Sequence, residues 1–144
     1  YHGRPDLTEE ITWRDANGVV YYRTGDLGYL DEDGFLHLRG RRKDVIISGG
    51  FNIHASDLEA VLVRHPAVAD AAVIGIPSEK WGETPLGFIV LEENSDISVE
   101  DLLDWANDRL GKTQRLSVLE FCEELPRNAA GKVMKRDLVQ KDPG

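Results

Sequence analysis

The chain of 144 residues contains one cysteine, Cys122. A single cysteine forms no disulfide within the chain and no cysteine-based metal site, so a reducing cytoplasm is the simplest location. The alternation of Val118, Glu120 and Cys122 predicts that the thiol is a small buried side chain. Histidines are also few, and their spacing is not that of metal ligands: His2, His37, His54 and His65.

Positive charge is scarce as well. The chain has 17 Lys and Arg against 26 Asp and Glu, which gives a net charge of −9. Because nucleic acid binding needs clustered Lys and Arg, we do not expect a nucleic acid partner. The sequence also lacks the roughly 18 consecutive apolar residues of a membrane span and the pattern of a signal peptide. The apolar fraction of 41% and the charged fraction of 30% are those of an ordinary globular protein.

The first forty residues have the pattern of strands and tight turns. Residues 19–22 are β-rich, and residues 27–31 can pair with residues 35–39 across an Asp-Gly turn signal. Two short strands are not stable alone in water. We therefore interpret residues 1–40 as the end of a larger upstream domain, with residues 1–14 as a poorly anchored lead-in.

The character of the sequence changes after Gly40. Ser56 and Glu59 form a capping-box pattern that predicts a helix up to Pro66, and Ser98 with Asp101 predicts a second helix. Strands are expected at 45–47, 51–53, 71–76, 86–91 and 118–121, and a short last helix at 134–139. This β-β-α-β-β-α-β-α order predicts an α+β fold, a small sheet packed with helices, for residues 41–144.

Four short motifs follow one another along the chain. They are Tyr-Arg-Thr-Gly-Asp at 22–26, Gly-Arg-Arg-Lys-Asp at 40–44, Ser-Gly-Gly-Phe-Asn-Ile at 48–53 and Leu-Pro-Arg-Asn-Ala-Ala-Gly-Lys-Val at 125–133. In this order and spacing they resemble the C-terminal part of the acyl-adenylate-forming superfamily. That superfamily comprises acyl- and aryl-CoA synthetases, luciferases and the adenylation domains of nonribosomal peptide synthetases. The resemblance implies that residues 41–144 are the lid domain and that residues 1–40 end the large AMP-binding domain.

The resemblance also assigns nucleotide and hinge residues. It implies that Asp26 binds the ribose of ATP, that Arg41 contacts ribose or phosphate, and that Tyr22 lies near the nucleotide. It makes residues 41–44 an interdomain hinge with Lys43 as its pivot. Taken without the resemblance, Asp26 is an ordinary turn residue, and the Arg-Arg-Lys run is a solvated linker.

Gly49, Gly50 and Phe51 have two interpretations. From the residues alone they are a tight turn with glycine at positive φ. The resemblance implies that they line the tunnel for the pantetheine arm of CoA. Trp81, by the same two interpretations, either packs locally or lines the path of CoA.

The segment 111–115 stays unassigned. It departs from the Lys-x-Pro element of the superfamily because it lacks the proline, so Lys112 and Arg115 receive no role. Gly111-Lys112-Thr113 also looks like the end of a phosphate-binding P-loop, but Ala106 stands where that loop needs a glycine.

Lys132 is the candidate catalytic residue. An arbitrary lysine near a chain end is usually only exposed. The resemblance implies that this lysine reaches the substrate carboxylate and the α-phosphate. A cation there stabilises the charge that develops when two anions react.

The expected function is therefore the C-terminal part of an ATP-dependent acyl- or aryl-CoA synthetase, fatty acids being among the candidate substrates. The expected ligands are ATP, CoA and Mg²⁺, with the ion held mainly by the large N-terminal domain, which is the expected partner. Two other functions stay open: the C-terminal subdomain of a nonribosomal peptide synthetase adenylation domain, and a non-catalytic interaction module with the same fold.

Overall fold

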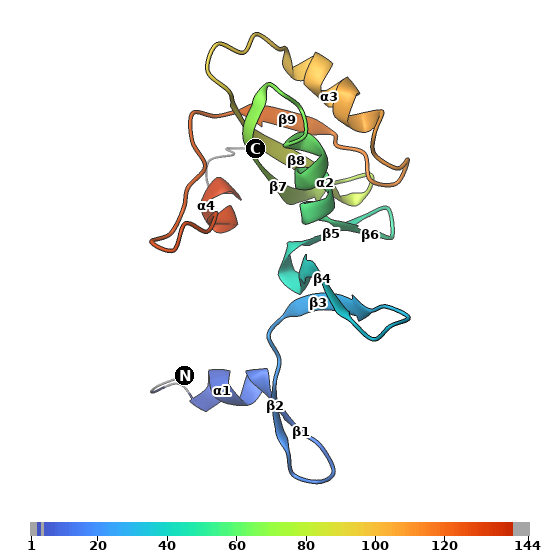
Figure 1. Cartoon of the computed structure of the whole chain (residues 1–144), viewed down its shortest axis with the longest axis vertical. Helices are drawn as coiled ribbons and strands as arrows, with labels where there is room; N and C mark the ends of the chain where they lie inside the picture. Colours follow the sequence, from blue (N-terminus) through green and yellow to red (C-terminus); the bar gives the residue numbers. More distant parts are fainter. Residues whose placement is uncertain (1–2, 4, 140–144) are drawn as a thin grey trace. The chain divides into compact units, whose positions relative to one another are not determined.

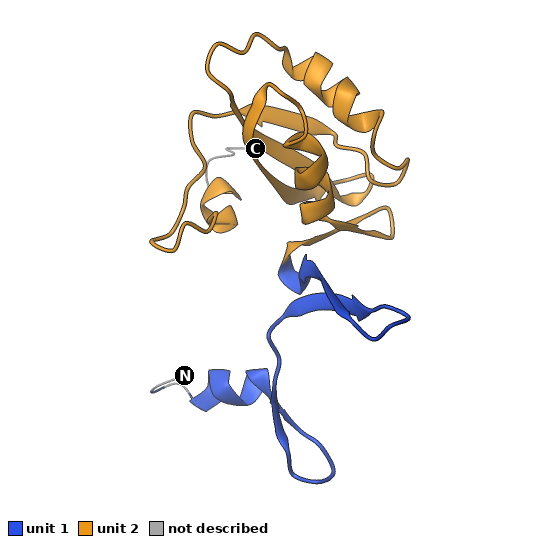
Figure 2. Ribbon diagram, in the orientation of Figure 1, with its two compact units in different colours: residues 1–43 blue, residues 44–144 orange. Residues whose placement is uncertain are grey.

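The structure is a computed structural model that describes residue 3 and residues 5–139. The chain divides into two compact units, residues 1–43 and residues 44–144 (Figure 2). The division lies within a short 3₁₀ turn, Arg42–Asp44. The segment predicted to be the hinge therefore contains the junction of the two units, and its movement stays a prediction.

The first unit consists of one helix and two antiparallel pairs of strands (Figure 1). Helix α1 is Pro5–Ile11, β1 (Thr12–Arg14) pairs with β2 (Val20–Tyr22), and β3 (Asp26–Leu30) pairs with β4 (Leu36–Arg41). The β3–β4 hairpin was predicted from its turn signal. Residues 5–14 form α1 and β1, which the sequence did not predict; Thr12 Oγ1 donates to the carbonyl of Thr8 at 2.9 Å and joins the two elements.

The described residues of the first unit form no core of their own. Among the residues that the structure describes in this unit, 3 and 5–43, none is buried. Large apolar and aromatic side chains are instead exposed: Trp13, Val19, Val20, Tyr21, Tyr22, Tyr29, Leu30, Phe35, Leu36 and Leu38. Such a surface is typical of strands that are covered by further protein.

The second unit has the predicted α+β order. Its elements are β5 (Val45–Ser48), β6 (Phe51–His54), α2 (Ala55–Leu62), β7 (Val68–Ser78), β8 (Gly82–Leu91), α3 (Val99–Asn107), β9 (Val118–Phe121) and α4 (Lys135–Val139). The five strands form one sheet in the order β6-β5-β8-β7, with β9 pairing with β8. The β8–β9 pair is parallel and the other pairs are antiparallel.

Apolar clusters cover both faces of this sheet. Along β7, Ala71 and Val73 pack in one cluster with α2 and α3, whereas Ala72 and Ile74 pack in a second cluster with Leu138 of α4. Successive side chains of a strand point to opposite faces, so two covered faces require a continuous apolar run. This explains the unbroken apolar stretches from which the strands were predicted.

The capping box predicted at Ser56 and Glu59 is wrong. Helix α2 begins at Ala55 with His54 as its N-cap, and the His54 side chain makes no capping hydrogen bond. The Glu59 carboxylate instead accepts from the amide of Val73 at 2.9 Å and pairs with Lys135 Nζ at 2.7 Å. The carboxylate thus joins α2 to β7 and α4. No local sequence pattern predicts these contacts, because the partners lie far apart in the chain.

Two smaller predictions have different outcomes. Ser98 caps α3 as predicted, because its side chain accepts from the amide of Asp101 at 3.0 Å. Cys122 is half-buried and not fully buried, and its thiol lies 3.6 Å from the carbonyl oxygen of Ile89.

Candidate functional site

The turn between β5 and β6 is built on two glycines with positive φ, 57° at Gly49 and 83° at Gly50. The Gly49 amide donates to the carbonyl of Trp81 at 2.8 Å. A Cβ added at Gly49 would lie only 2.9 Å from Trp81 Cε3, whereas one at Gly50 would meet open space. Gly49 is therefore required both by its backbone conformation and by the indole ring packed against it.

A cavity of about 290 Å³ lies beside this turn. Gly49 and Phe51, which were predicted to bind CoA, line it together with Trp81. The remaining lining is polar or basic: Ser48, Thr84, Lys112, Thr113, Arg115 and Ser117. Gly50 is not part of the lining. The cavity is thus lined by two aromatic side chains, by a glycine that leaves its backbone accessible, and by two cationic side chains.

Lys112 and Arg115 are the residues that sequence reasoning missed. They belong to the loop between α3 and β9, which is held by Asn107: its Oδ1 accepts from the amide of Leu116 at 2.9 Å, and its Nδ2 donates to the Leu116 carbonyl at 3.1 Å. Leu116 is buried and anchors the loop. The charges were visible in the sequence, but only the pairing of β9 with β8 brings them beside Gly49. The loop follows a helix and precedes a strand, so it is not a P-loop.

Lys132 lies on a tight turn that its own hydrogen bonds define. The Asn128 amide donates to the Lys132 carbonyl at 2.9 Å, and the Lys132 amide donates to Asn128 Oδ1 at 2.9 Å. Gly131 adopts φ 79° within the turn, and Arg127 pairs with Val133 as an isolated β-bridge. The lysine is exposed, so the hydrogen-bonded turn presents its ammonium group to the solvent.

The predicted nucleotide-binding residues belong to the first unit. Asp26 and Arg41 are cross-strand neighbours in the β3–β4 hairpin, and Arg41 Nε lies 3.4 Å from Asp26 Oδ1. Tyr22 ends β2, in the other strand pair, with 70% of its surface exposed. Lys43 is exposed in the 3₁₀ turn that follows β4.

One carboxyl group in the first unit has a perturbed pKa. Asp31 precedes the β3–β4 turn, and its hydrogen bond to His37 (2.6 Å) lowers its pKa, as does the bond from the amide of Phe35 (2.8 Å). These bonds favour the ionised carboxylate and tie the turn together.

Within residues 3 and 5–139, no group of three or more His, Cys, Asp or Glu side chains is arranged to hold a metal ion. In the same residues, no helix has the length and apolar composition needed to cross a membrane.

The sequence and fold match characterised proteins. The AMP-binding enzyme C-terminal domain family matches residues 57–132, more than half of the chain. The 2-succinylbenzoate–CoA ligase of Bacillus cereus strain Q1 is 44% identical over 140 residues, which is 97% of this chain and 28% of that protein. The chain therefore spans little more than a quarter of the length of the curated relatives it matches.

Solved structures agree with this match. ATP-bound MatB from Rhodopseudomonas palustris has a TM-score of 0.84 at 33% identity, with 97% of this chain and 27% of that one covered. O-succinylbenzoate coenzyme A synthetase (MenE) from Bacillus subtilis, in complex with AMP, has a TM-score of 0.82 at 39% identity, with 99% and 27% covered. The chain belongs to the family of AMP-binding enzyme C-terminal domains.

Proposed function

We propose that this chain is the C-terminal part of an ATP-dependent acyl- or aryl-CoA synthetase. The observation that carries the proposal is that the second unit holds two different features. One is an exposed lysine on a hydrogen-bonded turn, and the other is a cavity lined by aromatic and basic residues. Two features of this kind suit a reaction in two steps. The curated relative that is 44% identical carries the name of a CoA ligase, which supports the same reaction class.

In the first step, a carboxylate oxygen attacks the α-phosphorus of ATP, and pyrophosphate leaves with the electrons of the broken P–O bond. Both reactants are anions, so a cation that contacts the transferring group lowers the barrier. Lys132 is proposed to supply this charge. Asp26 is proposed to accept hydrogen bonds from the ribose hydroxyls, with Arg41, its ion-pair partner, beside it and Tyr22 near the nucleotide.

In the second step, the thiol of CoA attacks the acyl carbon, and AMP leaves. The cavity beside Gly49 is proposed to receive part of CoA, and its volume of about 290 Å³ is near the lower end of ligand pockets. Because Gly49 has no side chain, a slender pantetheine arm can approach the backbone. Lys112 and Arg115 offer charge-assisted hydrogen bonds to phosphate, and Trp81 offers a flat apolar surface.

The remaining assignments belong to the same proposal. Lys43 is proposed as the pivot between the two steps, and the large N-terminal domain as the partner that binds the acid and Mg²⁺. The substrate is proposed to be a carboxylic acid of aliphatic or aromatic type, and its selection is assigned to the large N-terminal domain. A cytoplasmic location fits a chain with one cysteine and no disulfide.

The test is to replace Lys132 with alanine in the full-length enzyme and to measure each half-reaction in single turnover. Adenylation should fall by about 10²–10³, because one preorganised donor is lost. Thioester formation from synthetic acyl-AMP should be unchanged. Arg136→Ala, an exposed cation on α4, is the control and should alter neither step. Equal losses in both half-reactions for Lys132→Ala would contradict the proposal.

A further inference from the structure

The turn that carries Lys132 has a defined shape, but its own hydrogen bonds do not fix its position on the domain. All of them join residues within the segment 126–134: Met134 to Pro126, Asn128 to Lys132, and Gly131 to Asn128. Val133, the residue after Lys132, packs against the second apolar cluster and holds one side of the turn. A second contact, on the other side of Lys132, is needed to fix its position, because a catalytic group displaced by about 1 Å can lose about 10² in rate.

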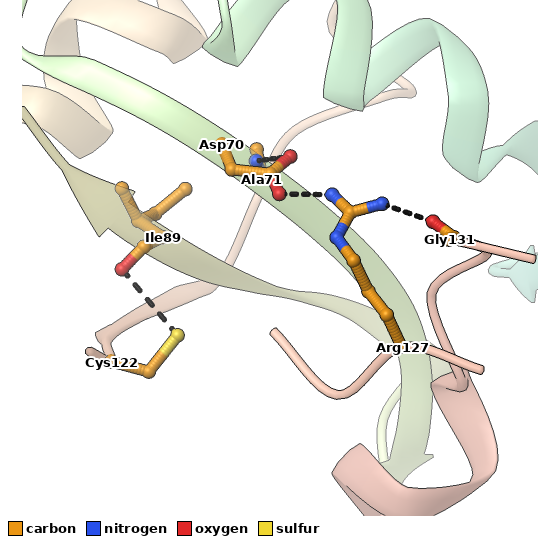
Figure 3. A network of polar contacts seen from close by, with 6 residues as sticks. All are labelled: Asp70, Ala71, Ile89, Cys122, Arg127 and Gly131. Carbon is orange, nitrogen blue, oxygen red and sulfur yellow. Dashed lines mark hydrogen bonds and ion pairs between the residues drawn. The ribbon is translucent and has the colours of Figure 1, made fainter. Parts of the chain in front are cut away.

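Arg127 makes that contact. Its Nη1 donates to the carbonyl of Gly131, the residue before Lys132, at 2.6 Å. Its Nη2 donates to the carboxylate of Asp70 on β7, with which it forms an ion pair (Figure 3). One planar guanidinium therefore joins the turn to the sheet, and a lysine cannot reproduce this two-directional geometry.

Asp70 is itself held in place. Its Oδ1 accepts from the amide of Ala71 at 2.9 Å, which leaves Oδ2 for Arg127 (Figure 3). The β7–β8 pairing changes register between Val68 and Asp70, so the carboxylate stands at an irregularity of the strand. Strand irregularities of this kind redirect a side chain.

We propose that Arg127 and Asp70 are positioning residues for Lys132. The inference rests on the proposed role of Lys132 in adenylation. The two residues do not touch the reacting atoms; they set where the lysine turn lies relative to the sheet.

The fold of the segment does not depend on this pair. Leu125 and Leu138, on either side of the turn, are buried, and Lys135 is held by Glu59. The Arg127 and Asp70 side chains are 43% and 33% exposed, and exposed ion pairs contribute little to global stability. Loss of the pair should therefore move the turn without unfolding the domain.

The experiment compares Arg127→Ala, Arg127→Lys and Asp70→Asn in the full-length enzyme. Each should lower the single-turnover rate of adenylation by about 10- to 100-fold, while thioester formation from synthetic acyl-AMP and the Tm stay close to wild type. The double variant Arg127→Ala/Asp70→Asn should be no slower than Arg127→Ala, because both changes remove one contact.

Arg109→Ala is the matched control. Arg109 is also exposed and also donates to a backbone carbonyl, that of Trp105 at 2.9 Å, but it lies beyond the end of α3. This variant should leave the adenylation rate unchanged. The comparison separates the effect of losing the Arg127–Asp70 contact from the effect of losing any exposed arginine.

A readout that needs no chemistry completes the test. Amide hydrogen exchange at Gly131 and Lys132 should become about two- to fivefold faster in Asp70→Asn, as expected for the loss of an exposed ion pair, while the amides between β7 and β8 keep their protection. The inference is overturned if Lys132→Ala abolishes adenylation but Arg127→Ala and Asp70→Asn stay within twofold of wild type, or if their two half-reactions and Tm fall together. If Lys132→Ala leaves adenylation intact, the proposed function fails and this inference fails with it, whatever the exchange shows.

Discussion

The two units differ in what holds them together. Residues 44–139 have apolar clusters on both faces of a five-stranded sheet, with Leu58, Leu62 and Leu102 fully buried. The described residues of the first unit have no buried side chain, although they carry Phe35, Leu36 and other large apolar groups. The second unit therefore has the interior of an independent domain, whereas the first has an exposed apolar surface, which is typical of strands that are covered by further protein.

This difference also separates the proposed tasks. The second unit contains both Lys132 and the cavity beside Gly49, which are the features proposed for the two half-reactions. The first unit contributes Asp26 and Arg41 on a hairpin whose apolar side chains are exposed. The nucleotide site is thus expected to be complete only in the full-length enzyme.

The largest expected effect is the complete absence of adenylation activity in the isolated chain. Residues 1–144 alone should form no acyl-AMP, because the nucleotide and acid pockets are proposed to be completed by the large N-terminal domain. The measurement is pyrophosphate exchange into ATP with a panel of simple carboxylic acids. Exchange above background by the isolated chain would show that the first unit needs no further domain.

The next effect tests the difference in packing. Leu62→Ala should destabilise the chain by about 2–5 kcal/mol, because the leucine is fully buried and its removal leaves a cavity. Leu36→Ala, at a side chain that is 64% exposed, should change stability by less than about 0.5 kcal/mol. Denaturant unfolding of the chain measures both. In the full-length enzyme Leu36→Ala should become more costly than in the isolated chain.

Lys43→Pro tests the junction between the units. Proline fixes φ near −65° and removes the amide donor, so the full-length enzyme should be held near one arrangement. One half-reaction should fall at least about tenfold more than the other, since a hinge variant affects the step that needs the other arrangement. Separate rates for adenylation and thioester formation decide this, and equal losses would argue against Lys43 as the pivot.

The smallest effect concerns the β3–β4 turn. The pKa of Asp31 is lowered from its ordinary value of 3.8, chiefly by His37 and then by the Phe35 amide. The ionised carboxylate therefore stabilises the hairpin above the unfolded-state pKa, and this contribution is lost as the pH falls through the lowered pKa. An NMR titration of the carboxyl carbon should show the lowered pKa, and His37→Ala should raise it. An unchanged titration in His37→Ala would contradict the assigned cause.

Local patterns predicted most of the secondary structure. Glycine turns such as Gly49–Gly50 and the cap at Ser98 depend on neighbours in sequence, and both are found as predicted. The start of α2 was misplaced because Glu59 bonds to Val73 and Lys135, which lie far along the chain. The parallel pairing of β9 with β8 likewise depends on packing that no local pattern encodes.

The candidate site shows the same limit. The sequence alone supplied tight turns and charges, and the resemblance supplied the roles of Lys132 and Gly49. Neither placed Arg115 in the same cavity lining as Trp81, because the position of its loop depends on the hydrogen bonds of Asn107 to Leu116. The position of Arg127 against Asp70 also follows from the sheet.

The central claim is that one domain carries two sites used in different steps. The most direct measurement determines both half-reaction rates for Lys132→Ala and Gly49→Ala in the full-length enzyme. Gly50→Ala is the control for Gly49→Ala, because both positions have positive φ but only Gly49 has the Trp81 ring against it. We predict a crossed pattern, in which Lys132→Ala lowers adenylation and Gly49→Ala lowers thioester formation more than Gly50→Ala does. The claim is contradicted if both Lys132→Ala and Gly49→Ala slow the same half-reaction.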